Sequence, residues 1–400
     1  MVEWKEYRIK DLGEVVTGNT PPTSNREYYG TEYKFIKPTD MVEGQRFVST
    51  TEEYYSELAY QKYKKCLLPP KTPCVVTIGS LGKKMCLTDT ECFTNQAVNA
   101  VIPNKENDGE FLYYAFKASV LAYVKQLDSG TTSGRENVSK SSFSKIKVRV
   151  PPLPTQQKIA SILSAYDNLI QNYKKQIEAL QTAASELYKE WFVRFRFPGY
   201  KNSRFENGIP EGWKVARLKD IAKDVGKTIT KNEINYEKDV YIPIDCIPNH
   251  NMALTEVSDI ENAESSLQRF ESGDILFGAM RVYFHKVILA PMQGVTRKTC
   301  FVIHAKKDIF HNYLYSLLFS NTTINYANTI SVGATMPYVR WNDFIRMQCL
   351  FPSEKILNDY NKIISPIFKT IMNSYKYLSN LTQQRDLLLP RLMSGKLEVK

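Results

Sequence analysis

The chain has 400 residues, a formal net charge of +11 at pH 7, and 43% hydrophobic and 12% aromatic residues. This length favours more than one domain, and the composition excludes a disordered protein. The moderate positive charge permits nucleic-acid binding without proving it. The N-terminus lacks the pattern of a secretory signal peptide, and no run of about 18 apolar residues occurs, so we expect a soluble cytoplasmic protein with no membrane partner.

The cysteines and histidines predict no metal site and no cofactor. The seven cysteines form no CxxC pair, which is typical of reduced, mostly buried thiols in the cytoplasm. The four histidines stand in no spacing that metal-binding sites use, and they are His250, His285, His304 and His311.

The strongest internal signal is a long two-fold repeat. Trp4–Leu12 and Trp213–Ile221 share Trp, Lys, Arg, Lys and Asp at identical spacing. Matching segments then follow in the same order in both halves. They are a buried strand ending in glycine (Val75–Ser80, Asp274–Ala279), a helix (about 111–126, about 310–327), a glycine loop (Ser129–Thr132, Val332–Thr335) and a strand ending at proline (Phe143–Pro151, Phe344–Pro352).

A long helix is predicted after each of these prolines. Thr155 and Ser353 are suitable N-cap residues, because a side-chain oxygen can accept a hydrogen bond from a free backbone N–H. Apolar residues then recur every three or four positions in a narrow seam, which indicates that the two helices pack on each other. Pro366 lies inside the second helix and is expected to kink it or to cost one hydrogen bond.

These elements predict an α+β protein in which two mixed α/β domains form a pseudo-two-fold tandem repeat, separated by two long antiparallel packed helices. Trp4, Trp213, Phe143 and Phe344 hold equivalent repeat positions, so we interpret them as core residues. The predicted parts are a first domain at 1–150, a helix at 151–197, a linker at 198–212, a second domain at 213–351, and a second helix with the C-terminal segment at 352–400.

Three segments together resemble the DNA specificity subunit of type I restriction–modification systems. They are the repeated Trp-Lys-x-x-Arg opening, the first helix lead Pro151–Ala160 (PPLPTQQKIA) and the ending Gln384–Leu397 (QRDLLLPRLMSGKL). The resemblance covers essentially the whole chain. One departure is the second helix lead Pro352–Lys355 (PSEK), where the family has a Gln pair after the cap, and it puts a local partner contact in doubt.

The resemblance implies a targeting protein that is not itself a catalyst. Each domain would read one half of an asymmetric, bipartite site in double-stranded DNA, and the helices would set the spacer between the halves. Two modification subunits would dock on the helices and methylate adenine, and restriction (motor-nuclease) subunits would add cleavage.

Candidate DNA contacts are basic or amide residues beside glycine-rich loops, where the backbone can approach a duplex. An ordinary solvated surface residue is the alternative at each position. We expect Arg135→Ala and Arg297→Ala each to weaken specific binding by about 1–3 kcal/mol. The candidates are Lys83, Lys84, Asn95, Gln96, Arg135 and Asn137 in the first domain, and Arg281, His285, Arg297, Lys298 and Arg340 in the second.

Three other functions remain to be weighed. A DNA methyltransferase needs a glycine-rich cofactor loop and an aromatic residue after a Pro-Pro motif, and Asn19–Thr23 (NTPPT) imitates that motif poorly. A nuclease needs clustered carboxylates to hold Mg²⁺, and Glu32–Lys34 (EYK) offers an ExK spacing without a convincing Asp partner. A protein scaffold that does not bind DNA is excluded only through the family resemblance, and a test of salt-sensitive DNA binding would separate the two.

Overall fold

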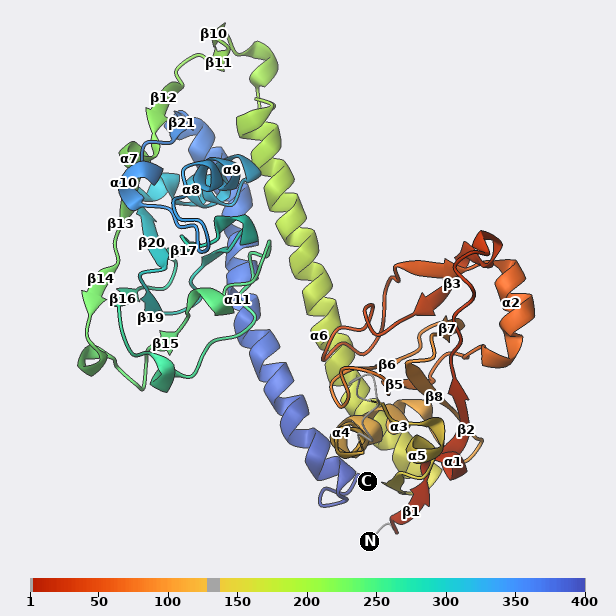
Figure 1. Cartoon of the computed structure of the whole chain (residues 1–400). Helices are drawn as coiled ribbons and strands as arrows, with labels where there is room; N and C mark the ends of the chain where they lie inside the picture. The colour runs from red at the N-terminus through yellow and green to blue at the C-terminus, as the bar shows by residue number, and fades with distance from the viewer. Residues whose placement is uncertain (1–2, 128–136, 400) are drawn as a thin grey trace. The chain divides into compact units, whose positions relative to one another are not determined.

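The computed structural model describes residues 3–127 and 137–399 and divides into two compact units. Unit 1 comprises Met1–Leu169 and Thr382–Lys400, and unit 2 comprises Ile170–Leu381. Each unit therefore combines one globular domain of the repeat with parts of both long helices (Figure 1).

Unit 1 contains two small sheets and a separate strand pair. The strand pair joins β1 (Lys5–Arg8) to β9 (Lys147–Val150), and the short helix α1 (Ile9–Leu12) follows β1. The first sheet has the order β2-β8-β5-β6 and the second has the order β4-β3-β7. Their strands are β2 (Gly13–Thr17), β8 (Val98–Pro103), β5 (Pro73–Val76), β6 (Met85–Leu87), β4 (Glu53–Tyr55), β3 (Tyr29–Ile36) and β7 (Cys92–Thr94).

Unit 2 repeats this plan. Its strand pair joins β12 (Lys214–Arg217) to β21 (Gln348–Phe351), and α7 (Leu218–Ile221) follows β12. The sheets have the orders β13-β20-β17-β18 and β14-β16-β19-β15. Their strands are β13 (Ala222–Asp224), β20 (Cys300–Ala305), β17 (Ile275–Gly278), β18 (Val287–Leu289), β14 (Lys227–Ile229), β16 (Leu267–Phe270), β19 (Gly294–Arg297) and β15 (Val240–Tyr241).

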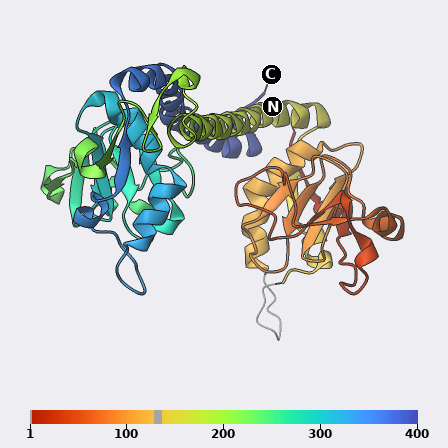
Figure 2. The ribbon, with the colours of Figure 1, turned by 90° about the horizontal axis from the view of Figure 1, so that it is seen from above.

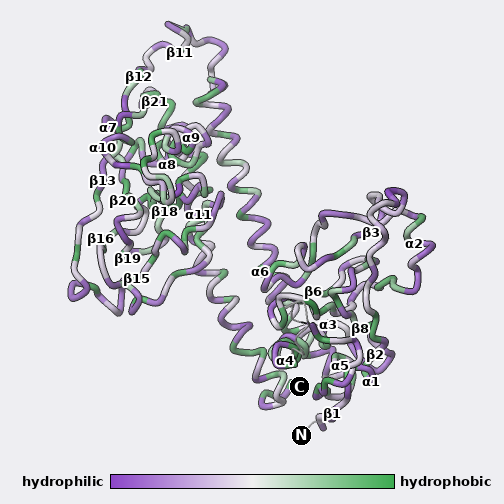
Figure 3. The backbone as a smooth tube through the Cα atoms, viewed as in Figure 1, coloured by the Kyte–Doolittle hydropathy of each residue, from purple (hydrophilic) through white to green (hydrophobic). Residues whose placement is uncertain are grey.

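Burial explains the strand patterns. All four residues of β5 are buried, as are all four of β17, which is typical of a central strand covered on both faces. In β9 only alternate residues are buried, because Val148 and Val150 point to the core while their neighbours face solvent. In unit 2 the hydrophobic stretches of the chain gather around α8 and β18 (Figure 3).

The predicted helix of the first repeat is confirmed, whereas that of the second is divided. In unit 1, α3 (Gly109–Ala115), a π-helical segment (Phe116–Val120) and α4 (Leu121–Gln126) form one continuous helical run. In unit 2, α8 (His311–Leu318) ends before α9 (Asn321–Thr329) begins. The interruption arises because the Ser320 hydroxyl caps α9, accepting a hydrogen bond from Thr323 N at 3.3 Å.

The strands predicted from Phe143 and Phe344 begin later than expected. Both phenylalanines lie in short helices, α5 (Lys140–Ser144) and α10 (Trp341–Phe344), that precede β9 and β21. Their core role is confirmed, since both rings are fully buried, and Trp213 is buried while Trp4 packs against the unit 1 core. The expectation for the cysteines is also confirmed, because five of the seven are buried and all are free.

The two long helices are α6 (Leu153–Tyr188), extended by a π-helical segment to Val193, and α11 (Glu354–Met393). Ser353 directly precedes α11, as predicted, but the prediction that Thr155 caps α6 is wrong. Thr155 lies inside the first turn, where its N–H donates to Pro152 O at 2.9 Å. Proline lacks an N–H and tolerates the first helical turn, so the helix begins earlier than its polar residue indicates. Pro366 does not interrupt α11.

Gln156 explains why the two helix leads differ in sequence. Its side chain is buried and bonds to Pro151 O (2.9 Å), Asn107 Oδ1 (3.2 Å) and the backbone N–H of Asp108 (2.9 Å). Counting from the prolines after β9 and β21, the equivalent residue in unit 2 is the buried Leu357. The glutamine that the second lead lacks therefore fastens unit 1 internally.

The helices pack antiparallel, as predicted, and this is established within unit 2. Rings stack or tilt against each other at both ends of the contact, 5.6 Å apart for Trp191 and Tyr360 and 5.8 Å apart for Tyr173 and Tyr377. Within unit 1 the two helices meet through an ion pair in which Arg385 Nη1 lies 2.7 Å from Asp167 Oδ1. Two further elements are α2 (Glu57–Tyr63) in unit 1 and the hairpin β10 (Phe205–Glu206) and β11 (Ile209–Pro210) after α6.

Candidate nucleic-acid interface

Three segments of unit 2 meet at the carboxyl end of β17, and we call them the unit 2 loop face. They are Ala279–Lys286, Arg297–Thr299 and Val332–Arg340. Two backbone bonds join them, because Ala279 N donates to Thr299 O at 2.8 Å and Val339 N donates to Ala279 O at 2.8 Å. Seen from above, the loop that follows α9 stands out from unit 2 (Figure 2).

Unit 1 has the equivalent arrangement, the unit 1 loop face, formed by Thr77–Lys84, Asn95–Ala97 and Asn137–Val138. Here Thr77 N donates to Ala97 O at 2.8 Å and Val138 N donates to Thr77 O at 2.8 Å. The same two bonds therefore hold both loop faces. The predicted glycine loop of the second half, Val332–Thr335, lies on the unit 2 loop face, whereas that of the first half, Ser129–Thr132, lies outside the described residues.

The repeat register inferred from the glycines is wrong by three residues. Val76 N donates to Lys84 O at 3.1 Å, and Gly278 N donates to Lys286 O at 2.8 Å, so Val76 corresponds to Gly278. Gly79 therefore corresponds to Arg281. Both residues adopt the left-handed backbone region, with φ of 64° and 48°. Glycine adopts this conformation freely, whereas arginine is strained in it.

One lysine in each unit supports the turn from beneath. Lys84 Nζ donates to Pro38 O at 2.8 Å, and Lys286 Nζ donates to Ile244 O at 2.8 Å. The equivalent lysines thus make equivalent bonds to a neighbouring loop. Lys84, a predicted DNA contact, is half-buried and engaged in holding the turn.

His285, another predicted contact, lies under the turn rather than on it. Its ring is 3% exposed and packs 4.5 Å from the Phe319 ring. Burial lowers the pKa of His285 to about 4, so the ring is neutral at pH 7. His285 Nε2 lies 2.8 Å from Phe319 O, which can only accept, so Nε2 carries the proton.

The other predicted residues of unit 1 lie on its loop face. Lys83 and Gln96 are exposed, and Asn95 and Asn137 are half-buried. The Asn95 carboxamide accepts from Ala97 N at 3.1 Å and so shapes the turn, whereas Gln96 accepts from the Thr20 hydroxyl at 2.5 Å. Arg135 lies outside the described residues.

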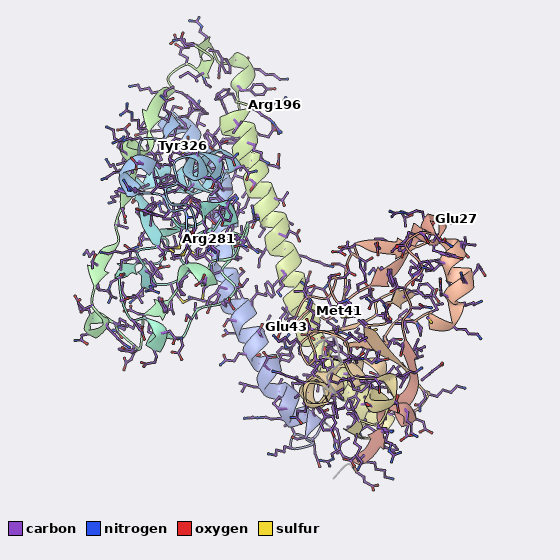
Figure 4. The ribbon with its side chains drawn as sticks, in the orientation of Figure 1. Glu27, Met41, Glu43, Arg196, Arg281 and Tyr326 are labelled. Carbon is purple, nitrogen blue, oxygen red and sulfur yellow. The ribbon has the colours of Figure 1, made fainter. Side chains whose placement is uncertain are left out.

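The predicted cations of unit 2 also come together on its loop face. Arg297, Lys298 and Arg340 are exposed. Arg281, which is labelled in Figure 4, is half-buried. Arg297 makes a bond of 3.3 Å to the Ser265 hydroxyl. A hydrogen bond with the Tyr338 hydroxyl raises the pKa of Arg340. None of the three loop-face segments contains Asp or Glu, so the surface is suited to an anion.

Sequence reasoning missed the apolar part of this face. Tyr283, Phe284, Met336 and Tyr338 are exposed there among the cations. The available signal was the Tyr-Phe pair itself, at the position where the first repeat has Leu81-Gly82. Glycine-based alignment displaced the two turns relative to each other and concealed this difference.

The described residues offer no group of three or more His, Cys, Asp or Glu side chains that could hold a metal ion. The ExK lysine, Lys34, instead pairs with Asp89 at 2.9 Å. Within the part of the chain that the structure describes, no helix is long and apolar enough to cross a membrane.

Comparison with known proteins identifies the family of the chain. A family model described as the type I restriction modification DNA specificity domain matches residues 1–182 and 210–384. The chain belongs to this family. It is 30% identical over 421 residues to the type I restriction enzyme MjaIX specificity subunit of Methanocaldococcus jannaschii, covering 100% of this chain and 94% of the relative.

A second curated relative and a solved structure are also similar to this chain. The type I restriction enzyme HindI specificity subunit of Haemophilus influenzae is 35% identical over 175 residues, 42% of this chain and 38% of that protein. The fold resembles the crystal structure of the type I restriction-modification S subunit from M. genitalium, with a TM-score of 0.67, 17% identity and coverage of 98% and 96% of the two chains. The family places the chain among specificity subunits rather than with the methyltransferase or nuclease alternatives.

Proposed function

We propose that each unit of this specificity subunit reads one half of a bipartite, asymmetric site in double-stranded DNA. The observation that supports this is the pair of loop faces, which share backbone hydrogen bonds but carry different side chains. A repeated frame presents two reading surfaces, and different side chains make the two half-sites unequal. We take 1–150 and 213–351 as the reading domains, 198–212 as the linker, and 151–197 and 352–400 as the helical spacers.

The side chains on each face suit different contacts with a duplex. Lys83 and Lys298 are exposed cations suited to phosphates, which position a protein without specifying sequence. Carboxamides such as that of Gln96 pair with adenine, and guanidinium groups such as that of Arg340 pair with guanine. We assign Lys84 and His285 to holding the turns, because their polar groups already bond within the protein.

The helices would dock two modification subunits that methylate adenine, and restriction subunits would join that complex. Supporting this, α6 and α11 leave large apolar side chains exposed, among them Leu169, Ile363 and Leu387. Exposed apolar side chains on a long helix are suited to covering by a partner. A complex that acts on host and incoming DNA works in the cytoplasm.

The test is to co-express the chain with its modification subunits and map methylated adenines across the host genome. We expect methylation confined to one split, asymmetric motif and absent when this chain is omitted. An assembled complex that binds the methyl donor yet methylates no such motif would refute the proposal.

A protein scaffold with no DNA partner is the remaining alternative, and salt dependence separates the two. Each phosphate contact releases counterions, so the logarithm of the binding constant falls linearly with the logarithm of salt concentration. Because the loop faces carry several exposed cations, we expect a steep slope, which a scaffold would not have.

A further inference from the structure

Two adjacent aromatic rings are exposed on the unit 2 loop face. Tyr283 is 47% exposed and Phe284 is 37% exposed, and their ring centroids lie 4.7 Å apart. Met336 and Tyr338 are exposed on the neighbouring segment, which pairs with this one through a bridge between Met280 and Tyr338. A cluster of exposed apolar side chains of this kind marks an interaction surface more often than a chance arrangement.

The turn that carries the two rings is held in one conformation. Phe284 N donates to Arg281 O at 3.0 Å, and His285 N donates to Val282 O at 2.8 Å. Arg281 and His285, on either side of the rings, both have positive φ, of 48° and 54°. Such strained residues persist only where the surroundings fix them, and they occur often at binding sites.

The turn is anchored to the rest of unit 2 on several sides. Arg281 N donates to Pro337 O at 2.7 Å, and Val282 is buried. The helix α9 lies beside the turn, and Tyr326 of that helix and Arg281 of the turn are both labelled in Figure 4. The rings are therefore displayed by a rigid support, and they lose little conformational entropy when a partner covers them.

The charge around the rings selects the partner. The three segments of this face contain no carboxylate and five cationic side chains, of which Lys286 is already bound to Ile244 O. The other four are Arg281, Arg297, Lys298 and Arg340. A protein or lipid partner would suit the apolar rings alone, but the surrounding cations match a polyanion. A polyanion that also offers apolar surface is nucleic acid, whose bases stack on rings and whose thymines carry a methyl group.

We propose that Tyr283 and Phe284 contact bases of the half-site read by unit 2 and help to determine its sequence. This inference rests on the proposed function and adds a mode of reading to it. Lys298 is suited to holding a phosphate, while the rings contact the apolar surface of a base step. The equivalent turn of unit 1 has Leu81, which is buried, and Gly82, so the contact belongs to the unit 2 half-site alone.

The experiment compares variants of the full chain, assembled with its modification subunits, on the duplex identified by methylation mapping. The test variant is Tyr283→Ala with Phe284→Ala. The matched control is Tyr236→Ala, because Tyr236 is also 47% exposed and lies in the turn before β15, which is not one of the loop-face segments. Removal of base-contacting rings should weaken binding to the mapped duplex roughly 5- to 100-fold.

Two readouts distinguish base contact from general weakening. Binding to unrelated duplex and the salt slope should stay at wild-type values in the double variant, since phosphate contacts are retained. Unchanged binding to the mapped duplex, or an equal loss on mapped and unrelated duplex, would overturn the inference. Thermal unfolding of each variant checks the fold, and little change is expected because both rings are exposed.

A measurement on the wild-type chain makes the test independent of the variants. Uracil in place of thymine, position by position in the unit 2 half-site, should weaken binding where a ring contacts the methyl group. 2-Aminopurine should instead change in fluorescence where a ring enters a base step. If neither analogue responds at any position, the inference is refuted. The proposed function fails separately, when the wild-type complex itself shows no preference for the mapped duplex.

Discussion

The ion pair between Asp167 of α6 and Arg385 of α11 allows a demanding test of how the helices are held in unit 1. Both side chains are mostly buried, at 10% and 12% exposure, and the Tyr114 hydroxyl also donates to Asp167, at 2.6 Å. Asp167→Ala leaves the guanidinium buried with only Asp386, which is half exposed, as its partner. Removing one member of a buried pair costs about 3–5 kcal/mol, and the remaining partner favours the lower end of that range.

Hydrogen exchange measured by mass spectrometry resolves this effect within a large chain. A loss of about 3 kcal/mol corresponds to roughly 100-fold faster exchange through local opening. We expect this acceleration in the α11 residues of unit 1, 382–393, and unchanged exchange in residues 356–371 of the same helix, which belong to unit 2. An acceleration below about fivefold in residues 382–393 would show that water screens the pair and would refute the reasoning.

The second repeat offers a matched rescue. Counting from the prolines after β9 and β21, Asp167 corresponds to Phe368 and Arg385 to Ala184, and both of these lie in the apolar core of unit 2. Buried ion pairs are often replaced by apolar residues at no cost. The combination Asp167→Phe, Arg385→Ala and Tyr114→Phe should therefore recover most of the protection lost in Asp167→Ala. Failure to recover any would mean that the two helix contacts are not interchangeable.

Three further predictions concern the helix lead, the buried histidine and the loop-face cations. Gln156→Leu introduces the residue type of the equivalent Leu357. Because it leaves Pro151 O and Asp108 N without partners, it should lower the unfolding free energy of unit 1 by about 1–3 kcal/mol in denaturant titration. A smaller loss would show that water replaces the amide. For His285, the folded pKa of about 4 lies below the unfolded 6.5, so its stability contribution is complete above pH 6.5 and decreases as the pH falls toward 4. The stability advantage of wild type over His285→Leu should decrease by about 3 kcal/mol across this window, and a constant difference would contradict burial of the neutral ring beside His250. Arg297→Ala should weaken specific DNA binding by about 1–3 kcal/mol, and an equal loss on all DNA sequences would make Arg297 a phosphate contact instead. Lys298→Ala should reduce the salt slope by about 1 without altering the preferred sequence.

The periodic and repeated features of the fold were predictable from the sequence, because they depend on local patterns. The seam of the second helix, the core positions Phe143 and Phe344, and the tandem repeat are confirmed. The seam of the first helix is confirmed only in part, because Ile162 and Leu169, which were assigned to it, are exposed. Element starts were less predictable. The first lead has a polar residue, Thr155, where a cap was expected, but two prolines begin the helix earlier. Ser320 interrupts a helical pattern that looked continuous, since its hydroxyl competes for the backbone.

The candidate site was predictable in chemistry but not in geometry. Gln96 and Lys298 were chosen separately in the two halves, yet they occupy equivalent turns. Gln96 precedes Ala97, whose carbonyl accepts from Thr77 N, and Lys298 precedes Thr299, whose carbonyl accepts from Ala279 N. That equivalence depends on hydrogen bonds between segments distant in sequence, which no local pattern encodes. Tyr283 was missed for a related reason, since its exposure follows from the positive φ of Arg281, a conformation rarely expected of arginine.

On each loop face, the groups that hold the fold differ from the side chains that point outward, and this affects how the recognised DNA sequence can change. The bonds that hold each face are made by the backbone and by Lys84 or Lys286, whereas the outward side chains contribute little to the fold. Arg297, for example, makes one long bond of 3.3 Å to a serine. Substitution of such exposed residues usually alters stability by less than about 0.5 kcal/mol. New half-sites are therefore accessible through the outward side chains at almost no cost in folding, whereas changes at the two lysines or at His285 disturb the frame on which every reading residue depends.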